Sequence, residues 1–259
     1  MHRRSAIVLE PGKEYLAESR LESVARDNGL QSVTELVQRM RSGMIDLGDA
    51  VVDAMTTNET SFFRDAHPFN ALRDSVLPEL IAARRIARSL TIWCAATSSG
   101  QEPYSLAMIL REHFPEVLDW QIRIIATDLS PTMLACTREG RYSQLEVNRG
   151  LPAPMLVKYF TRDGMHWIVA EELRRMVSTQ YLNLNERWPV LPPFDLILMR
   201  NVLIYFDVAT KQQILGKVRQ QLRPDGLLLL GGAETTMNLD ANFERVPHGR
   251  STWYRPTGA

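Results

Sequence analysis

A short polar segment beside two phenylalanines, Asn58-Glu-Thr-Ser-Phe-Phe-Arg64, carries side chains suited to binding a charged small molecule. It sets an amide, a hydroxyl and a guanidinium next to an apolar anchor. The segment also marks a change in composition, because charged helical patterns precede it and apolar strand-like runs follow it. Ligand sites are often built at such a junction. We therefore predict that its polar side chains bind a ligand, whereas Phe62 and Phe63 pack in the core.

Polar side chains also follow predicted strands farther along the chain. The small-residue loop Ala95-Ala-Thr-Ser-Ser-Gly-Gln-Glu102 follows the first strand, Asp128 ends the second, and Arg200-Asn201 follows the third. Open α/β sheets bind nucleotides at this edge, where an acidic side chain can accept hydrogen bonds from ribose hydroxyls. The loop has one glycine, Gly100, whereas a pyrophosphate needs several. Together these residues predict a ligand that contains adenosine but no dinucleotide phosphate.

Each of these features also has a simpler structural explanation. The loop is typical of an ordinary strand-to-helix turn, Asn201 of a turn residue, and Tyr205 of core packing. Asp128 could cap a helix, but Ser130 before Pro131 can supply that cap and leave Asp128 free. Their occurrence at one edge of the sheet favours the ligand site.

The elements that would position these residues alternate between strands and helices. We expect strands at residues 90–95, 122–127, 194–199 and 226–231, with helices at 103–113, 131–139 and 209–222. This order predicts βαβ units and a mostly parallel, Rossmann-like sheet. A short antiparallel insertion is expected where the alternation stops, with residues 166–170 as one arm and another strand at 178–184.

The beginning of the chain has a helical pattern instead. Apolar residues recur at helical spacing over residues 12–55, with breaks at Gly29 and Gly43, which predicts three short helices. Ser32 and Glu35 have the spacing of a capping box. A helical connection follows, interrupted at Pro78. We therefore divide the chain into a small all-α domain (1–66), a linker helix (67–88) and an α/β domain (89–259) that contains the β-subdomain insertion at about 140–181.

The composition restricts the classes of partner. Thirty basic and thirty acidic residues give a net charge of zero, which does not favour nucleic acid or an anionic membrane as a partner. Cys94 and Cys136 lie far apart and near no pair of histidines, so we expect neither a disulfide framework nor a metal site. No apolar run approaches transmembrane length. We expect a cytoplasmic monomer that does not insert into membranes.

With these motifs, the chain resembles the CheR family of chemotaxis-receptor glutamate methyltransferases. The resemblance rests on six segments in the family's order: Thr57-Asn-Glu-Thr-Ser-Phe-Phe-Arg-Asp65, Ser98-Ser-Gly-Gln-Glu-Pro-Tyr-Ser105, Ala126-Thr-Asp-Leu-Ser130, Lys158-Tyr-Phe160, Arg200-Asn-Val-Leu-Ile-Tyr-Phe-Asp207 and Leu222-Arg-Pro-Asp-Gly-Leu227. It implies an S-adenosylmethionine-dependent enzyme with S-adenosylhomocysteine as product. Its substrates would be glutamate side chains on the cytoplasmic helices of membrane chemotaxis receptors, methylated during sensory adaptation.

The resemblance also implies the site residues. By motif position, the cofactor would be bound by Asn58, Thr60, Arg64, Glu102, Asp128, Asn183, Leu184, Arg200 and Asn201. Tyr205 would lie near the reacting methyl. A glutamate is already ionised at neutral pH and a sulfonium methyl is already activated, so the enzyme mainly has to align them. We predict Arg64 and Tyr205 as the catalytic residues that do so.

The chain departs from the family pattern in its helical part. Only residues 1–11 precede the segment that aligns from Gly12, where the family usually has another helix. The helix expected at residues 13–26 keeps Arg20 and Arg26, but glutamates at positions 14, 18 and 22 dilute the positive charge that family members offer to receptors.

Two further departures lie in the α/β part. The insertion is short around residues 161–166, so we predict that methylation does not depend on a tethering pentapeptide at the receptor C-terminus. Gly231-Gly-Ala-Glu234 replaces the family's usual Gly-His-Ser-Glu, and no role is assigned to Gly232 or Ala233. The alternatives are a non-catalytic cofactor-binding adaptor and a methyltransferase for a small molecule. A nicotinamide oxidoreductase is disfavoured because the phosphate-binding glycines are missing.

Overall fold

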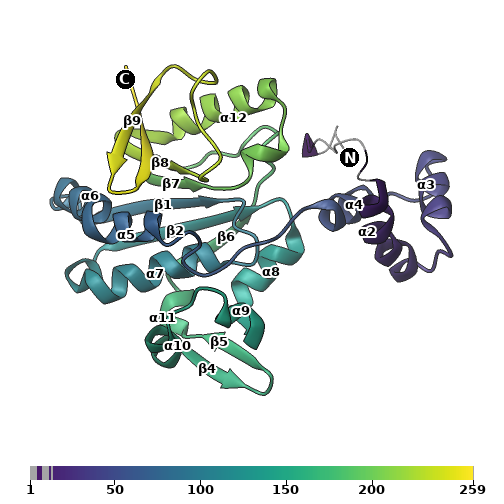
Figure 1. The fold of residues 1–259 in the computed structure, drawn as a ribbon, viewed down its shortest axis with the longest axis horizontal. Helices are drawn as coiled ribbons and strands as arrows, with labels where there is room; N and C mark the ends of the chain where they lie inside the picture. Colours follow the sequence, from purple (N-terminus) through teal and green to yellow (C-terminus); the bar gives the residue numbers. More distant parts are fainter. Residues whose placement is uncertain (1–4, 8–11, 13, 259) are drawn as a thin grey trace.

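The protein has a small helical domain and a larger α/β domain, joined by an irregular connecting segment at residues 56–66 (Figure 1). The computed structural model describes residues 5–7, 12 and 14–258. The three helices predicted from residues 12–55 are confirmed as α2 (Glu14–Asp27), α3 (Val33–Arg41) and α4 (Gly48–Met55). Most of the N-terminal stretch before Gly12 lies outside the described residues.

The predicted start of the second helix is confirmed at Ser32, but the capping box is only half formed. Ser32 Oγ accepts a hydrogen bond from the Glu35 N–H at 3.1 Å. The Glu35 carboxylate reaches one residue farther back and accepts from the Gln31 N–H at 2.9 Å. Two N–H groups near the helix start are therefore still satisfied, as a helix start requires.

The main sheet has seven strands in the order β6-β2-β1-β7-β8-β10-β9. The parallel strands are β1 (Ser89–Ala95), β2 (Gln121–Asp128), β6 (Val177–Tyr181), β7 (Phe194–Met199) and β8 (Leu222–Leu230). An antiparallel hairpin of β9 (Phe243–His248) and β10 (Ser251–Pro256) completes one edge. The predicted Rossmann-like sheet is thus confirmed, although the hairpin was not expected.

Helices cover both faces of this sheet. The principal ones are α7 (Gln101–His113), α8 (Pro131–Glu139) and α12 (Val208–Gln221), and η2 (Pro115–Val117) is a short turn before β2. Alternate residues of β1 enter different cores: Ile92 and Cys94 join the core that contains α7, whereas Trp93 and Ala95 join the core that contains α12. A fully buried strand needs apolar residues on both faces, which explains the continuous apolar run in the sequence.

The segment expected as a linker packs against the sheet. It consists of α5 (His67–Ala71), a π-turn η1 (Leu72–Val76) and α6 (Leu77–Arg84). Phe69, Leu72 and Leu77 are buried in the same core as α7. Pro78 does not interrupt the helical path. The Leu77 N–H bonds to the Leu72 carbonyl, five residues back, so the wider turn accommodates the missing proline N–H.

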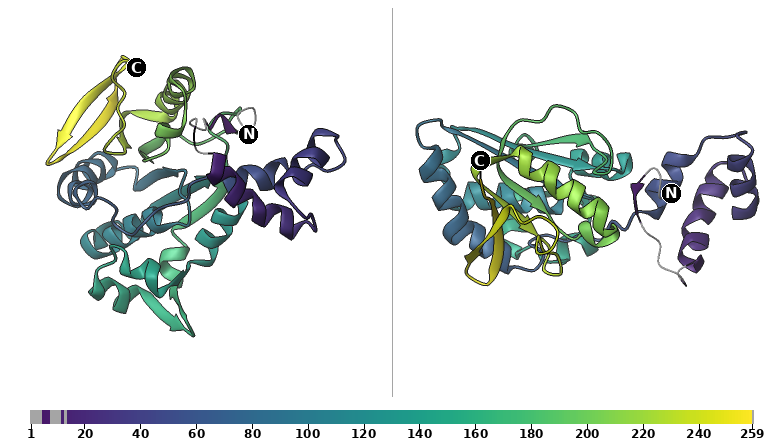
Figure 2. Two further views of the ribbon diagram at one scale, coloured as in Figure 1. Left: turned by 45° about the vertical axis from the view of Figure 1, so that its right-hand side comes forward. Right: turned by 90° about the horizontal axis from the view of Figure 1, so that it is seen from above.

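The insertion forms a second sheet with the order β3-β5-β4. Its elements are β3 (Arg141–Ser143), α9 (Gln144–Asn148), α10 (Ala153–Tyr159), β4 (Phe160–Asp163), β5 (His166–Val169) and α11 (Glu171–Arg174). Figures 1 and 2 show this small sheet on the opposite side of the α/β domain from the β9–β10 hairpin. The chain returns to the main sheet at Val177, where β6 pairs parallel with β2, so the last strand of the segment expected as insertion belongs to the main sheet.

Candidate active site

A cavity of about 590 Å³ lies at the carboxyl ends of β1, β2 and β7. The chain runs from β1 to β2 on one side and later returns to β7 on the other, so the loops diverge here and leave a crevice. The connecting segment and α2 close its outer side. All ten residues predicted for the site line this one cavity: Asn58, Thr60, Arg64, Glu102, Asp128, Asn183, Leu184, Arg200, Asn201 and Tyr205.

The loop after β1 is held in an unusual conformation. Ala96 and Ser98 have φ values of 53° and 52°, in the left-handed region that non-glycine residues rarely adopt. Gly100 has a φ of 93°, and a Cβ there would lie 2.8 Å from the Thr137 side chain. The single glycine of this loop therefore allows close packing against α8.

Asp128 is buried beside this loop, but it is not free as the sequence suggested. Its Oδ2 accepts from the Ser98 N–H at 2.7 Å, and its Oδ1 accepts from the Ser130 N–H at 2.9 Å. Ser130 supplies the predicted helix cap by accepting from the Met133 N–H. Burial raises the pKa of Asp128, whereas these backbone donors oppose the rise. Each carboxylate oxygen has a second lone pair, so the group can still accept a ribose hydroxyl.

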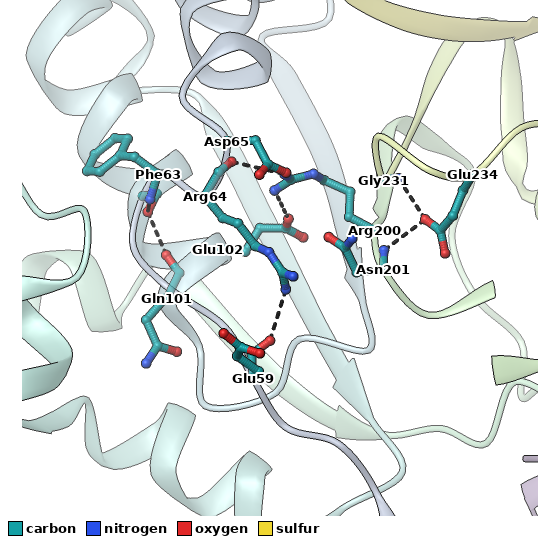
Figure 3. A network of polar contacts seen from close by, with 11 residues as sticks. Glu59, Phe63, Arg64, Asp65, Gln101, Glu102, Arg200, Asn201, Gly231 and Glu234 are labelled. Carbon is teal, nitrogen blue, oxygen red and sulfur yellow. Dashed lines mark hydrogen bonds and ion pairs between the residues drawn. The ribbon is translucent and has the colours of Figure 1, made fainter. Parts of the chain in front are cut away.

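Arg200 joins three parts of the site (Figure 3). Its guanidinium donates to Glu102 Oε2 at 2.9 Å, to Asp65 Oδ2 at 2.7 Å and to the Arg64 carbonyl at 2.9 Å. The side chain is 3% exposed and lies over the Phe69 ring. Arg200 thus binds the connecting segment to α7, and most of its donors are used within the protein.

Glu102 lies on α7 with its side chain 12% exposed. Burial raises the pKa of this carboxyl, and the nearby guanidinium groups of Arg200 and Arg64 oppose the rise. The Glu102 oxygen that accepts from Arg200 is Oε2. A buried carboxylate at the edge of a cavity is suited to binding the ammonium group of an amino-acid ligand.

Arg64 lies in a strained part of the connecting segment. Its neighbours Phe63, Asp65 and Ala66 have φ values of 49°, 70° and 49°. Such conformations cost about 1–3 kcal/mol each and persist only where the surroundings impose them. The Arg64 guanidinium donates to the Glu59 carbonyl at 2.9 Å, and it forms no ion pair with any residue that the structure describes. It therefore keeps donors that can bind a carboxylate.

The two phenylalanines before Arg64 pack in the core, as predicted. Phe62 is fully buried, and its ring makes edge contacts with Tyr142 and Phe160 of the insertion. Phe63 packs against Phe69 in the same manner. These contacts anchor the strained segment on both the insertion and α5, so the aromatic pair fixes the position of Arg64.

Four other predicted residues follow β6 and β7. Asn183 is held by Glu186 and by the Asn185 N–H, each at 3.0 Å, and Leu184 is buried in the core. Asn201 has a φ of 58° and is the second residue after β7. Tyr205 ends the short 3-10 turn η3 (Leu203–Tyr205).

Sequence reasoning missed several residues around the cavity. Arg20 was assigned to a receptor-facing surface, but its guanidinium donates to the carbonyls of Met55 and Thr56 at 2.9 and 3.2 Å and so ties α2 to the connecting segment. Glu234 accepts from backbone N–H groups of the loop after β7. Ser5 and Ile7 line the cavity, as Arg20 does, whereas Glu234 is not part of the lining. The Gly231-to-Glu234 motif was the only signal that could have identified Glu234.

Two buried polar atoms of the lining fit an adenosine-containing ligand. Thr97 Oγ1 and Asn201 Oδ1 are buried and have no hydrogen-bond partner among the described residues. Buried polar atoms are normally paired, and both residues line the cavity, so a bound ligand is a candidate partner for them. With Asp128 for ribose hydroxyls and Glu102 for an ammonium group, the lining suits S-adenosylmethionine. The described residues contain no group of three or more His, Cys, Asp or Glu side chains that could hold a metal ion.

Comparisons with known proteins identify the family. Residues 58–252 match the family described as "CheR methyltransferase, SAM binding domain", and residues 1–56 match "CheR methyltransferase, all-alpha domain". The chain is 42% identical to Chemotaxis protein methyltransferase 1 of Pseudomonas aeruginosa, over 98% of this chain and 94% of that protein. It is 41% identical to Chemotaxis protein methyltransferase 1 of Vibrio cholerae, over 93% and 88%.

A solved glycopeptide N-methyltransferase, MtfA in complex with S-adenosylmethionine, is similar over 79% of this chain and 73% of that chain, with 16% identity and a TM-score of 0.38. This likeness is too distant to add to the argument. No helix among the described residues is long and apolar enough to cross a bilayer. The two family matches together cover nearly the whole chain. The chain therefore belongs to the CheR family of chemotaxis protein methyltransferases, which use S-adenosylmethionine as methyl donor.

Proposed function

We propose that this protein methylates glutamate side chains of chemotaxis receptors and forms glutamate methyl esters. The observation that carries the proposal is Arg64, a cation in the cavity lining that has no ion pair with the described residues. Such a guanidinium is suited to a carboxylate, either that of the substrate or that of the cofactor's amino-acid part. The charge that the site presents therefore supports an acceptor that carries a carboxylate.

Different lining residues are assigned to different parts of the cofactor. We assign Asp128 to the ribose hydroxyls and Glu102 to the amino group; Thr97 and Asn201 also line the cavity. When bound, S-adenosylmethionine supplies an electrophilic methyl group. The residues of the chain then have to hold the acceptor carboxylate in line with it and exclude water.

The charges of the reaction explain why alignment matters more than charge stabilisation. A carboxylate and a sulfonium become two neutral groups, so charge disappears on the way to the transition state. A guanidinium held tightly on the attacking oxygen would stabilise the ground state more than the transition state. We assign Arg64 to orientation of the reactants and Tyr205 to a weaker, directional hydrogen bond.

Substitution of Arg64 tests this assignment. Arg64→Ala should lower turnover at saturating cofactor and receptor by about 10²-fold, the order expected for misplaced reactants. Arg175→Ala is the matched control, because the ion pair of Arg175 with Glu171 is exposed on both sides. Normal turnover of the Arg64 variant would remove Arg64 from the mechanism.

We further propose that methylation is independent of a receptor C-terminal pentapeptide. The support is the short β4–β5 connection, in which only Gly164 and Met165 join the strands. An ion pair between Arg141 on β3 and Asp163 at the end of β4 lies beside this connection. In calorimetry, an isolated receptor C-terminal pentapeptide should show no submicromolar binding, and such binding would overturn the proposal.

The decisive experiment for the substrate is transfer of a labelled methyl group from S-adenosylmethionine to membranes that contain chemotaxis receptors. Treatment with base should release the label as volatile methanol, because carboxyl esters hydrolyse under these conditions whereas N-methyl groups do not. Label that stays bound after base treatment would refute a glutamate ester as the product.

A further inference from the structure

Glu234 has no part in the mechanism described so far, yet its carboxylate is the centre of a hydrogen-bond cluster (Figure 3). Oε2 accepts from the backbone N–H groups of Gly231 and Asn201 at 2.7 and 2.8 Å. Oε1 accepts from Val202 and Ile204 at 2.9 and 3.3 Å. One carboxylate from the loop after β8 thus holds three N–H groups of the loop after β7.

The loop after β7 carries two of the predicted site residues, Asn201 and Tyr205, and both line the cavity. Asn201 has a left-handed backbone and a buried Oδ1 without a partner among the described residues. Tyr205 follows in the same turn, and its N–H bonds to the Val202 carbonyl at 3.2 Å. The positions of both residues therefore depend on backbone groups that Glu234 holds.

We propose that Glu234 is a positioning residue for methyl transfer, acting through Asn201 on cofactor binding and through Tyr205 on turnover. The part that concerns turnover rests on the proposed function. A carboxylate is the side chain with enough acceptor sites for four N–H groups. A glutamine would replace one oxygen by an NH₂ donor that faces N–H donors, and a buried N–H left unpaired is costly.

Gly231 has a matching role in the cluster. A Cβ at this position would lie 2.7 Å from Glu234 Oε2 and 2.8 Å from the Asn201 nitrogen. Glycine therefore lets the two loops approach closely enough for the carboxylate to bridge them. This gives a second way to disturb the cluster, in which the carboxylate remains but loses its position.

The test is a double-mutant cycle between Glu234→Gln and Tyr205→Phe. We expect Glu234→Gln to lower kcat for receptor methylation at least tenfold at saturating cofactor, but less than threefold when Tyr205→Phe is already present. Glu244→Gln is the matched control, because Glu244 lies on β9 with a half-exposed side chain paired to Arg255. Equal losses in both backgrounds, or a normal kcat, would overturn the proposal, since a general structural defect does not depend on Tyr205.

Binding of S-adenosylhomocysteine provides a separate readout. Glu234→Gln should weaken this binding at least fivefold in calorimetry, and the loss should vanish when Asn201→Ala is already present. If the wild-type protein does not methylate receptor membranes, the proposed function fails, and this second cycle alone decides the role of Glu234. Unchanged affinity would then refute it. Where Glu234→Gln does not fold by circular dichroism, Gly231→Ala takes its place with the same expected pattern.

Discussion

Replacement of Arg200 by methionine should destabilise the protein far more than removal of an exposed arginine. The change keeps much of the apolar stem and deletes the guanidinium. Three contacts disappear, to the carboxylates of Glu102 and Asp65 and to the Arg64 carbonyl. Glu102 is then left at 12% exposure without the cation that now pairs with it.

The magnitude follows from this burial. Removing one partner of a buried ion pair costs about 3–5 kcal/mol, because the other charge stays buried without compensation. Since Arg64 still acts on Glu102 at longer range and Asp65 is half exposed, we expect about 3 kcal/mol. The control Arg175→Met breaks a pair whose side chains are 75% and 65% exposed, and should cost less than about 1 kcal/mol.

The dependence of this loss on pH identifies Glu102 as its cause. Burial raises the pKa of Glu102 in the folded state and Arg200 lowers it, so Arg200→Met raises it further. A carboxyl with a raised folded pKa binds more protons when folded than when unfolded, and stability falls as pH rises between the two pKa values. The loss should therefore be largest at neutral pH and shrink as the solution is acidified.

Urea unfolding at several pH values measures this effect, with the double variant Arg200→Met/Glu102→Gln as the second test. A neutral glutamine removes the uncompensated charge, so the double variant should be more stable at neutral pH than Arg200→Met alone. A loss as small as that of Arg175→Met, or a double variant less stable than the single one, would refute the reasoning.

Two other predictions concern the insertion and the receptor. Gly150→Ala should lower the free energy of unfolding by more than about 2 kcal/mol, because Gly150 has a φ of 86° and a Cβ there would lie 2.1 Å from the Phe62 carbonyl oxygen. Thermal unfolding checks this against Gly216→Ala in α12, where a Cβ meets nothing within 4 Å and a gain of about 0.5–1 kcal/mol is expected. Because α2 carries exposed glutamates and the net charge is zero, kcat/KM for receptor membranes should change less than about twofold between about 50 and about 300 mM salt; a tenfold fall would show that basic residues capture the receptor.

The sequence predicted the elements whose patterns depend on burial. The parallel strands β1 and β7 and the second half of β8 are buried on both faces and leave continuous apolar runs. The four expected strands were found within a few residues of their ends. The β9–β10 hairpin was missed because its strands have no continuous apolar run: Glu244 and Arg245 separate Phe243 from Val246, and in β10 only Trp253 and Tyr254 are buried. Pro78 was read as a break because a π-turn that accommodates a proline has no pattern in the sequence.

The candidate site was predicted from residues that end strands or match family motifs, and all ten line the cavity. What no pattern could give is the partner of each residue. Asp128 was expected to be free, but two N–H groups occupy it, and Arg20 was placed on a surface although it bonds to carbonyls of the connecting segment. Hydrogen bonds between a side chain and distant backbone depend on the approach of two loops, which spacing along the chain does not encode.

The hydrogen bonds of Arg200 and Glu234, which the sequence did not reveal, both fix the loop after β7. Arg200 holds the segment before α5 with its guanidinium, and Glu234 holds the backbone directly after Arg200. The loop from Arg200 to Tyr205 is thereby fixed from two sides, by an arginine toward α7 and by a carboxylate from the loop after β8. The proposed reaction, between an ionised acceptor and an activated methyl, gains little from an acid or a base and much from fixed geometry. On the proposed function, the ion pairs and backbone hydrogen bonds that hold Arg64, Asn201 and Tyr205 in place would therefore increase the rate of methyl transfer.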